Sequence, residues 1–236
     1  MLPLILEDVC FAAGGRPIIR GIACTIEAGS RTVILGPNGA GKSVLMRLCH
    51  GLLAPTSGRI TWKGRGDHRR PGAQAMVFQR PVMLRRSALA NITYGLELAG
   101  VSRSERELRA LDVLDAVGLA HAAHRPARVL SGGEQQKLAL ARAWALGPEV
   151  LFLDEPTANL DPGATREVET IVAQIRAGGT KIVMTTHNLG QAKRLGDEIM
   201  FIADGHLVER AGVDRFFASP ATAEAAAFIK GELPWN

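Results

Sequence analysis

A chain of 236 residues, of which 47% are apolar and 22% charged, has the length and balance of one globular domain. No run of about 20 apolar residues is present and no basic-then-apolar leader opens the chain, so we expect neither a membrane span nor a secretion signal. The three cysteines lack a CxxC spacing, which disfavours a disulfide framework. A net charge of +5 would permit a nucleic-acid partner, but the densest basic stretch, residues 63–70, has no aromatic side chain for stacking and is interpreted as a solvated loop.

Hydrophobic periodicity predicts alternating strands and helices along the chain. The expected strands are residues 4–9, 18–26, 31–35, 59–62, 150–153, 181–185, 199–202 and 207–210. Helical periods are expected at residues 44–52, through much of 84–129, and at 166–175. Within the middle helical region, Leu108, Leu111, Leu114 and Val117 form the stripe that we expect to be buried.

A phosphate-binding loop follows the apolar strand at 31–35. The motif G-x-x-x-x-G-K-S is filled by Gly36, Pro37, Asn38, Gly39, Ala40, Gly41, Lys42 and Ser43. Its glycines allow backbone N–H groups to face a phosphate, the lysine reaches the terminal phosphates, and the serine hydroxyl can ligate Mg²⁺. A glycine-rich turn that matches by chance is the alternative, which the strand-to-helix context disfavours.

Two carboxylates end the apolar run at 150–153. Asp154 can hold the water shell of Mg²⁺, and Glu155 can orient or deprotonate an attacking water. This pairing suits hydrolysis better than transfer to an acceptor. Two solvated acids at a strand end would give the same pattern, but the phosphate-binding loop in the same chain favours the catalytic interpretation.

A second turn suited to phosphate lies at Ser131, Gly132 and Gly133, where it opens a helix. Because one nucleotide has a single γ-phosphate, two such turns in one chain suggest a site shared between two copies. The alternative is an ordinary helix start, in which Ser131 and Glu134 form a capping box; the two interpretations are compatible.

Together with Asn159, Leu160, Asp161, Pro162 and His187, these motifs resemble the ATP-binding subunits of ABC transporters over nearly the whole chain. The resemblance implies an α/β fold, with a P-loop NTPase core and parallel sheet, a small antiparallel β subdomain and an inserted α-helical subdomain. It implies one ABC ATPase domain over residues 1–236, with the helical insertion at about 84–145.

The resemblance also assigns roles to individual residues. Gln79 matches a catalytic glutamine that contacts the Mg²⁺ site, Asp161 an aspartate that reaches across the dimer, and His187 a histidine on the γ-phosphate. Catalysis would then fall to Glu155, His187 and Gln79, and the metal to Ser43, Gln79 and Asp154. ATP and Mg²⁺ are the expected cofactors, and Ser131 and Gly133 of one copy would complete the site of the other.

One position departs from the family pattern. Ala13 stands where relatives usually carry an aromatic side chain for the adenine, so what stacks on the base is open. Phe11 is a candidate, and it is equally consistent with a core position.

The expected partners are separate permease subunits, a second copy of the chain and, indirectly, a solute-binding protein, but no nucleic acid. We therefore expect a cytoplasmic location, peripheral on the inner face of the cell membrane. Docking to the permease is expected at 81–92, although an ordinary loop and helix start would look the same. The resemblance is greatest to importers of oxyanions, tungstate first and then molybdate and phosphate; an exporter subunit, or a non-transport relative that acts on nucleic acid or ribosomes, is the alternative.

Overall fold

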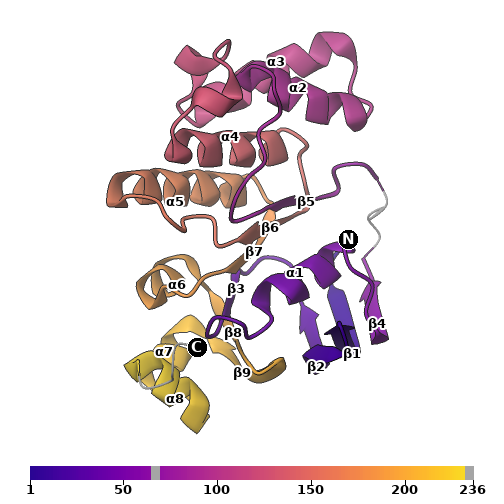
Figure 1. Ribbon diagram of the computed structural model, residues 1–236, viewed down its shortest axis with the longest axis vertical. Coiled ribbons are helices and arrows are strands. Elements are labelled where there is room, and N and C mark those ends of the chain that lie inside the picture. Colours follow the sequence, from indigo (N-terminus) through magenta and orange to yellow (C-terminus); the bar gives the residue numbers. More distant parts are fainter. Residues whose placement is uncertain (65–69, 232–236) are drawn as a thin grey trace. The chain divides into compact units, whose positions relative to one another are not determined.

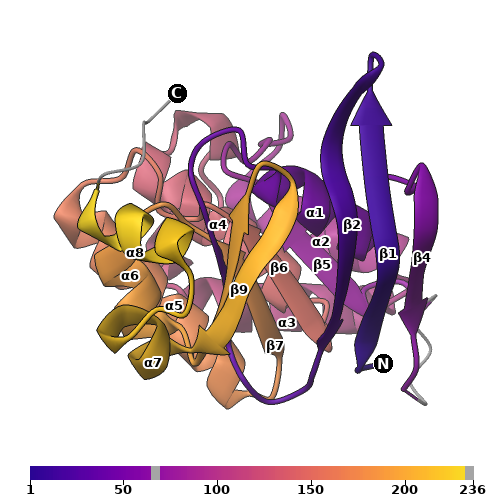
Figure 2. The same cartoon turned by 90° about the horizontal axis from the view of Figure 1, so that it is seen from below.

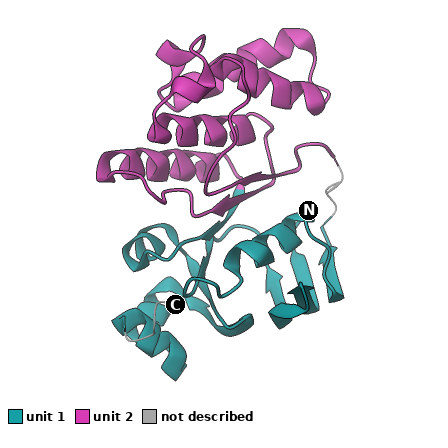
Figure 3. Ribbon diagram, viewed as in Figure 1, with its two compact units in different colours: residues 1–68, 181–236 teal, residues 69–180 magenta. Residues whose placement is uncertain are grey.

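The computed structural model describes residues 1–64 and 70–231 (Figure 1). It contains two compact units, one made of residues 1–68 and 181–236 (unit 1) and the other of residues 69–180 (unit 2; Figure 3). Within the described ranges, no helix has the length and apolar character needed to cross a bilayer. Most of the basic stretch and the end of the C-terminal tail lie at 65–69 and 232–236, outside the described residues.

Unit 1 begins with the small antiparallel sheet that the sequence predicts. Its strands, in the order β2-β1-β4, are β2 (Arg16–Ile26), β1 (Leu4–Ala13) and β4 (Ser57–Trp62). The two longer strands form a hairpin that runs to a turn at its outer end (Figure 2). Register shifts along this pair bend the hairpin, as extra residues in one strand of an antiparallel pair do.

The core of unit 1 is a second sheet with parallel strands. β3 (Thr32–Leu35) pairs in parallel with β7 (Lys181–Thr185) and with β8 (Glu198–Ala203), and β9 (His206–Gly212) returns antiparallel to β8. Every residue of β3 and β7 is buried, and residues 33–35 and 182–184 within them form continuous apolar runs, as expected of strands covered on both faces. The predicted parallel strands and the C-terminal hairpin are confirmed.

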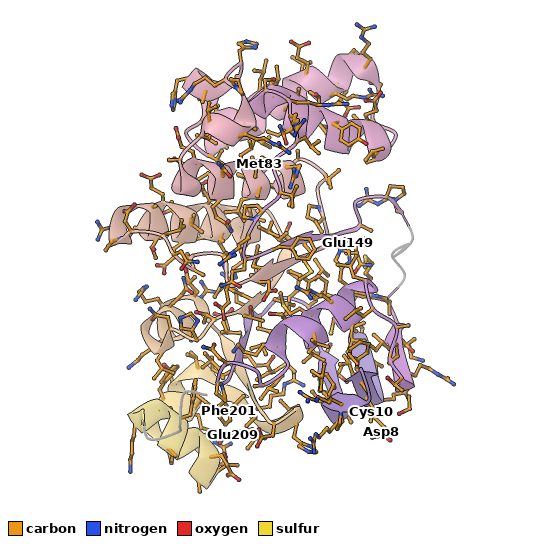
Figure 4. All side chains as sticks on the ribbon, viewed as in Figure 1. Asp8, Cys10, Met83, Glu149, Phe201 and Glu209 are labelled. Carbon is orange, nitrogen blue, oxygen red and sulfur yellow. The ribbon has the colours of Figure 1, made fainter. Side chains whose placement is uncertain are left out.

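The C-terminal helices of unit 1 pack on this sheet through aromatic side chains. The helices of the unit are α1 (Lys42–His50), α6 (Leu189–Leu195), α7 (Val213–Ala218) and α8 (Ala223–Lys230). The Phe201 ring lies 5.9 Å from that of Phe216 and 5.0 Å from that of Phe228. Phe201 and Glu209, labelled in Figure 4, both lie beside α7 and α8. The C-terminal segment up to residue 230 therefore packs on the core of its own unit.

Unit 2 combines a parallel strand pair with a helical region. β5 (Gln74–Val77) pairs in parallel with β6 (Val150–Asp154). The longer helices are α2 (Ala88–Leu98), α3 (Arg103–Ala116), α4 (Gly132–Trp144) and α5 (Pro162–Ala177), with short 3₁₀ turns at Ala120–Ala122 and Ala127–Val129.

The predicted apolar stripe of α3 is only half correct. Leu114 and Val117 are buried, but Leu108 is 65% exposed and Leu111 39% exposed. The inner face of α3 buries Ala110 together with Leu114. The packing of α2 and α4 on α3, rather than the size of its side chains, decides which face is covered. The prediction for Leu108 and Leu111 was therefore wrong.

Candidate nucleotide site

The phosphate-binding loop joins β3 to α1 in unit 1, as the motif requires. Gly36, Gly39 and Gly41 have φ angles of 155°, 79° and 98°, a region that side-chain-bearing residues rarely adopt. Space demands glycine as well, since a Cβ on Gly41 would lie 2.8 Å from Cδ1 of Ile19 and 3.0 Å from the carbonyl oxygen of Ile18. The backbone is thus able to approach a bound group closely.

Lys42 brings its charge to this loop. Its side chain is buried, and Nζ donates hydrogen bonds to the carbonyl oxygens of Gly36 at 2.8 Å and Pro37 at 2.9 Å. These two carbonyls orient the ammonium group within the loop. A phosphate oxygen would bind this group more strongly than a carbonyl does, because a charge-assisted hydrogen bond is the stronger one. The loop therefore fits the phosphates of a nucleotide.

In unit 2, two of the predicted catalytic residues are in contact. Nε2 of Gln79 donates to Oε2 of Glu155 over 3.4 Å. Glu155 follows β6 with a φ of 45°, an uncommon conformation for a residue with a side chain, and it lies directly after the buried Asp154. Backbone strain of this kind is concentrated at functional sites. The strained residue directly follows the strand end that carries Asp154, so both predicted acids lie at the end of β6.

The Ser-Gly-Gly turn opens α4 with a complete capping box. Oγ of Ser131 accepts from the backbone N–H of Glu134, and the Glu134 carboxylate accepts from the N–H of Ser131 at 2.8 Å. The hydrogen bonds from the Ser131 backbone and side chain hold the pKa of Glu134 below its ordinary value. Ser131 and Gly132 are exposed, so this helix start, with its partial positive charge, faces outward.

Asp161 and His187 occupy the ends of two other elements. Asp161 is exposed and caps α5, accepting from the N–H groups of Gly163 and Ala164. These two hydrogen bonds lower the pKa of Asp161, and the bond from Ala164 has the larger effect. His187 is exposed after β7 in unit 1, the strand that pairs with β3 before the phosphate-binding loop.

The predicted residues thus divide between the units. Unit 1 carries the phosphate-binding loop and His187, and unit 2 carries Gln79, Asp154, Glu155, Asp161 and the Ser131 turn. Within unit 2 the Ser131 turn lies near the start of α5, since a Cβ on Gly133 would be 3.0 Å from Cβ of Ala164.

The sequence did not reveal a groove within unit 2. Its volume is about 360 Å³, and its lining is mostly apolar, including Phe78, Pro81, Leu98 and Leu146, with Arg142 at its side. Leu98 is 67% exposed and the neighbouring Val82 70% exposed. These two exposed apolar side chains mark the position of the groove. Their exposure depends on the fold and cannot be seen in the sequence.

Comparison with known proteins connects this geometry to a family. The family model described as "ABC transporter" matches residues 19–158. A phosphate import ATP-binding protein, PstB 2 of Natronomonas pharaonis, is 35% identical over 98% of this chain and 87% of its own length. The tungstate uptake system ATP-binding protein TupC of Peptoclostridium acidaminophilum is 36% identical over 84% of this chain and 94% of its own length.

The fold leads to the same group of proteins. The dimeric, post-hydrolysis structure of the ATP-binding cassette MJ0796, bound to ADP and Pi, superposes with a TM-score of 0.79 at 26% identity, over 89% of this chain and 98% of the other. Fold, motifs and relatives agree, and the chain belongs to the ABC transporter family as an ATP-binding subunit, an ATPase coupled to transport.

Proposed function

We propose that the chain hydrolyses Mg-ATP between two of its own copies and that this cycle powers import through a separate permease. The contact between Gln79 and Glu155 carries the catalytic part of the proposal. A carboxylate positioned by an amide donor can orient a water for attack on the γ-phosphate.

Bound Mg²⁺ would neutralise the charge that develops on the phosphates. Ser43 at the start of α1 and Asp154 at the end of β6 offer the hydroxyl and carboxylate oxygens that this ion prefers, and Gln79 offers an amide oxygen. His187, at the end of β7, would contact the γ-phosphate. The phosphate-binding loop and Lys42 would hold the nucleotide.

The second copy would complete the site through the turn at Ser131. The capping box satisfies the N–H groups of Ser131 and Glu134 from within the chain. The N–H groups of Gly132 and Gly133, in the first turn of α4, remain available to a phosphate. Asp161, exposed at the start of α5, is the proposed further contact across the dimer. The dimeric relative bound to ADP and Pi supports this arrangement.

The test replaces Glu155 by glutamine, which keeps the shape of the side chain and removes its charge. We expect ATP binding to persist, turnover to fall at least about a hundredfold, and a dimer to accumulate with Mg-ATP in light scattering. Glu149→Gln is the matched control, because Glu149 is an exposed carboxylate at the other end of the same strand. Normal turnover in Glu155→Gln would refute the assignment. A persistent ATP-bound monomer would count against the shared site.

The groove of unit 2 is the proposed docking site for the permease. Three side chains hold its neighbouring loop in place: Asn91 accepts from the N–H of Leu84, Arg128 donates to the carbonyl of Met83, and Arg142 donates to that of Val82. The stretch expected to contact the permease is thus a fixed surface, lined with apolar groups. A short amphipathic helix would bury those groups.

This docking site can be tested separately from catalysis. Leu98→Glu adds a charge to an exposed position in the groove, at the end of α2 rather than on the strand that leads to Gln79. We expect the isolated variant to hydrolyse ATP normally and to lose solute uptake in cells. Leu108→Glu, an equally exposed leucine on α3, is the control and should retain uptake. If cells with the Leu98→Glu variant also retained solute uptake, the groove would not be the docking site of the permease.

Oxyanions, tungstate first, are the proposed solutes. TupC supports tungstate, while PstB 2 supports phosphate at a nearly equal identity, so the choice depends on the permease and solute-binding protein. The proposed location is the cytoplasmic face of the cell membrane, without nucleic acid as a partner. Uptake of labelled tungstate, molybdate and phosphate by cells lacking this chain would decide: loss of tungstate uptake alone supports the proposal, and unchanged tungstate uptake refutes it.

A further inference from the structure

The outer half of the β1–β2 hairpin lies against the phosphate-binding loop within unit 1. Cδ1 of Ile19 and the carbonyl oxygen of Ile18 approach Gly41 so closely that a Cβ there would lie 2.8 and 3.0 Å from them. In Figure 2 the hairpin runs beside α1 and ends at a turn. If phosphates bind at Gly41, the sugar and base of the nucleotide therefore lie next to this hairpin.

Strand register determines which side chains share that face. Phe11 lies opposite Ile19, and Ala13 lies opposite Arg16. Directly opposed residues of an antiparallel pair project to the same side, and so do residues two apart in one strand. The pairs Phe11–Ile19 and Ala12–Pro17 leave Ile18 as an extra residue of β2, and the Ile18 and Ile19 side chains both lie beside Gly41, 3.5 and 2.8 Å from a Cβ built there. Alternation therefore resumes at Pro17, and the pair Ala13 and Arg16 lies on the face of Ile19, next to Gly41.

Arg16 has the chemistry to bind a flat ring at this place. Its side chain is exposed, and the residue opposite it, Ala13, is too small to cover it. A guanidinium group is planar and permanently charged, and it stacks on aromatic rings. Phe11 is half-buried and lies two residues nearer the core, where it packs opposite Ile19.

We propose that Arg16 contacts the nucleobase, its guanidinium group stacking on the ring beside Ala13. The inference rests on the nucleotide site proposed above and identifies the group that selects the base. A stacked guanidinium group contacts the face of the ring, which adenine and guanine share, so this contact does not favour adenine. The protein therefore accepts purine nucleotides broadly and binds Mg-GTP about as tightly as Mg-ATP.

The experiment measures binding to the whole chain by calorimetry, with Mg-ATP, Mg-GTP and tripolyphosphate, which has the phosphates but no base. Arg16→Ala should weaken both nucleotides about fivefold to 30-fold and leave tripolyphosphate unchanged. Arg16→Lys keeps the positive charge but lacks the planar guanidinium group, so it should also weaken nucleotide binding while tripolyphosphate binds normally. In the Arg16→Ala background, Ala13→Tyr should restore ATP binding by supplying a new ring.

Arg20→Ala is the matched control. Arg20 is an exposed arginine of the same strand, and because it follows the buried Ile19 it projects to the opposite face. It should leave all three affinities unchanged.

Two results would overturn the proposal. Equal losses of ATP and tripolyphosphate in Arg16→Ala would mean that Arg16 acts only as a general positive charge. Unchanged binding of both would place the base elsewhere. Failure of the unaltered protein to bind either ATP or tripolyphosphate would instead refute the phosphate-binding loop, so the two hypotheses fail in distinguishable ways.

Discussion

Removal of the Glu209 carboxylate should release the C-terminal helices of unit 1. The side chain is 6% exposed, and its two oxygens accept from the N–H groups of Ala221 and Thr222 and from the Thr222 hydroxyl at 2.9–3.0 Å. Burial by itself would raise the pKa of Glu209, but these hydrogen bonds outweigh it and hold the pKa below its ordinary value. The carboxylate thus fixes the chain where it enters α8.

The size of the effect follows from the three donors. A buried hydrogen bond to a charged group contributes about 1.5–3 kcal/mol, but Ala221 is exposed and Thr222 half-buried, so water can replace part of what is lost. At about 1 kcal/mol per donor, Glu209→Ala should lower the free energy of unfolding by about 3 kcal/mol. For a chain of this length that corresponds to a Tm lower by about 6–12 °C.

The assay combines thermal unfolding with amide hydrogen exchange. Exchange in α7 and α8 should accelerate in Glu209→Ala, while the helices of unit 2 are unaffected. Because the pKa of Glu209 is lowered in the folded state, its contribution is present above the unfolded pKa of about 4.3 and is lost as the pH falls through the folded value. The difference between variant and unaltered protein should therefore shrink below about pH 4.

Glu224→Ala is the control for Glu209→Ala, since Glu224 is an exposed carboxylate in the first turn of α8. It should cost less than about 1 kcal/mol. If the two variants unfolded at the same temperature, or if Glu209→Ala left exchange in α8 unchanged, the reasoning about the three donors would be refuted.

Three further predictions concern single contacts. Lys42→Ala should weaken binding of a fluorescent ATP analogue at least tenfold through the lost charge, and an unchanged titration would contradict the role of the lysine. Ser131→Ala should cost about 1 kcal/mol of stability through the lost helix cap, measured by denaturant unfolding, and should also abolish the ATP-dependent dimer. If the dimer still formed, Ser131 would serve only as a helix cap. Phe228→Ala should cost about 3–4 kcal/mol in the same assay, because its ring packs 5.0 Å from that of Phe201, and a loss below about 1 kcal/mol would show that α8 contributes little.

Much of the fold can be predicted from residues that lie close together in the sequence. β3 and β7 contain the continuous apolar runs 33–35 and 182–184 because both faces of each strand are covered, and this burial makes the strands easy to recognise in the sequence. The capping box at Ser131 and Glu134 depends only on residues three apart, so spacing alone predicted it. The contact between Gln79 and Glu155 joins residues 76 apart in the chain, and there the sequence alone could offer no more than a family resemblance.

Other features depend on what packs beside an element. Leu108 and Leu111 continue an apolar helical period, but α2 and α4 cover a different face of α3, and periodicity does not contain that information. Arg16 was missed for a similar reason. Its position opposite Ala13 follows from register shifts between Val9 and Ala12, which decide the face that each later residue of the hairpin occupies.

The close approach at Gly41 links two features that lie far apart in the sequence. The phosphate-binding loop and the hairpin meet at Gly41, which faces the side chain of Ile19 and the carbonyl oxygen of Ile18. A side chain at position 41 would have to displace these atoms of β2, and with them the strand that carries Arg16. The glycine of the motif therefore determines how closely the hairpin can lie beside the loop, as well as how the loop itself turns.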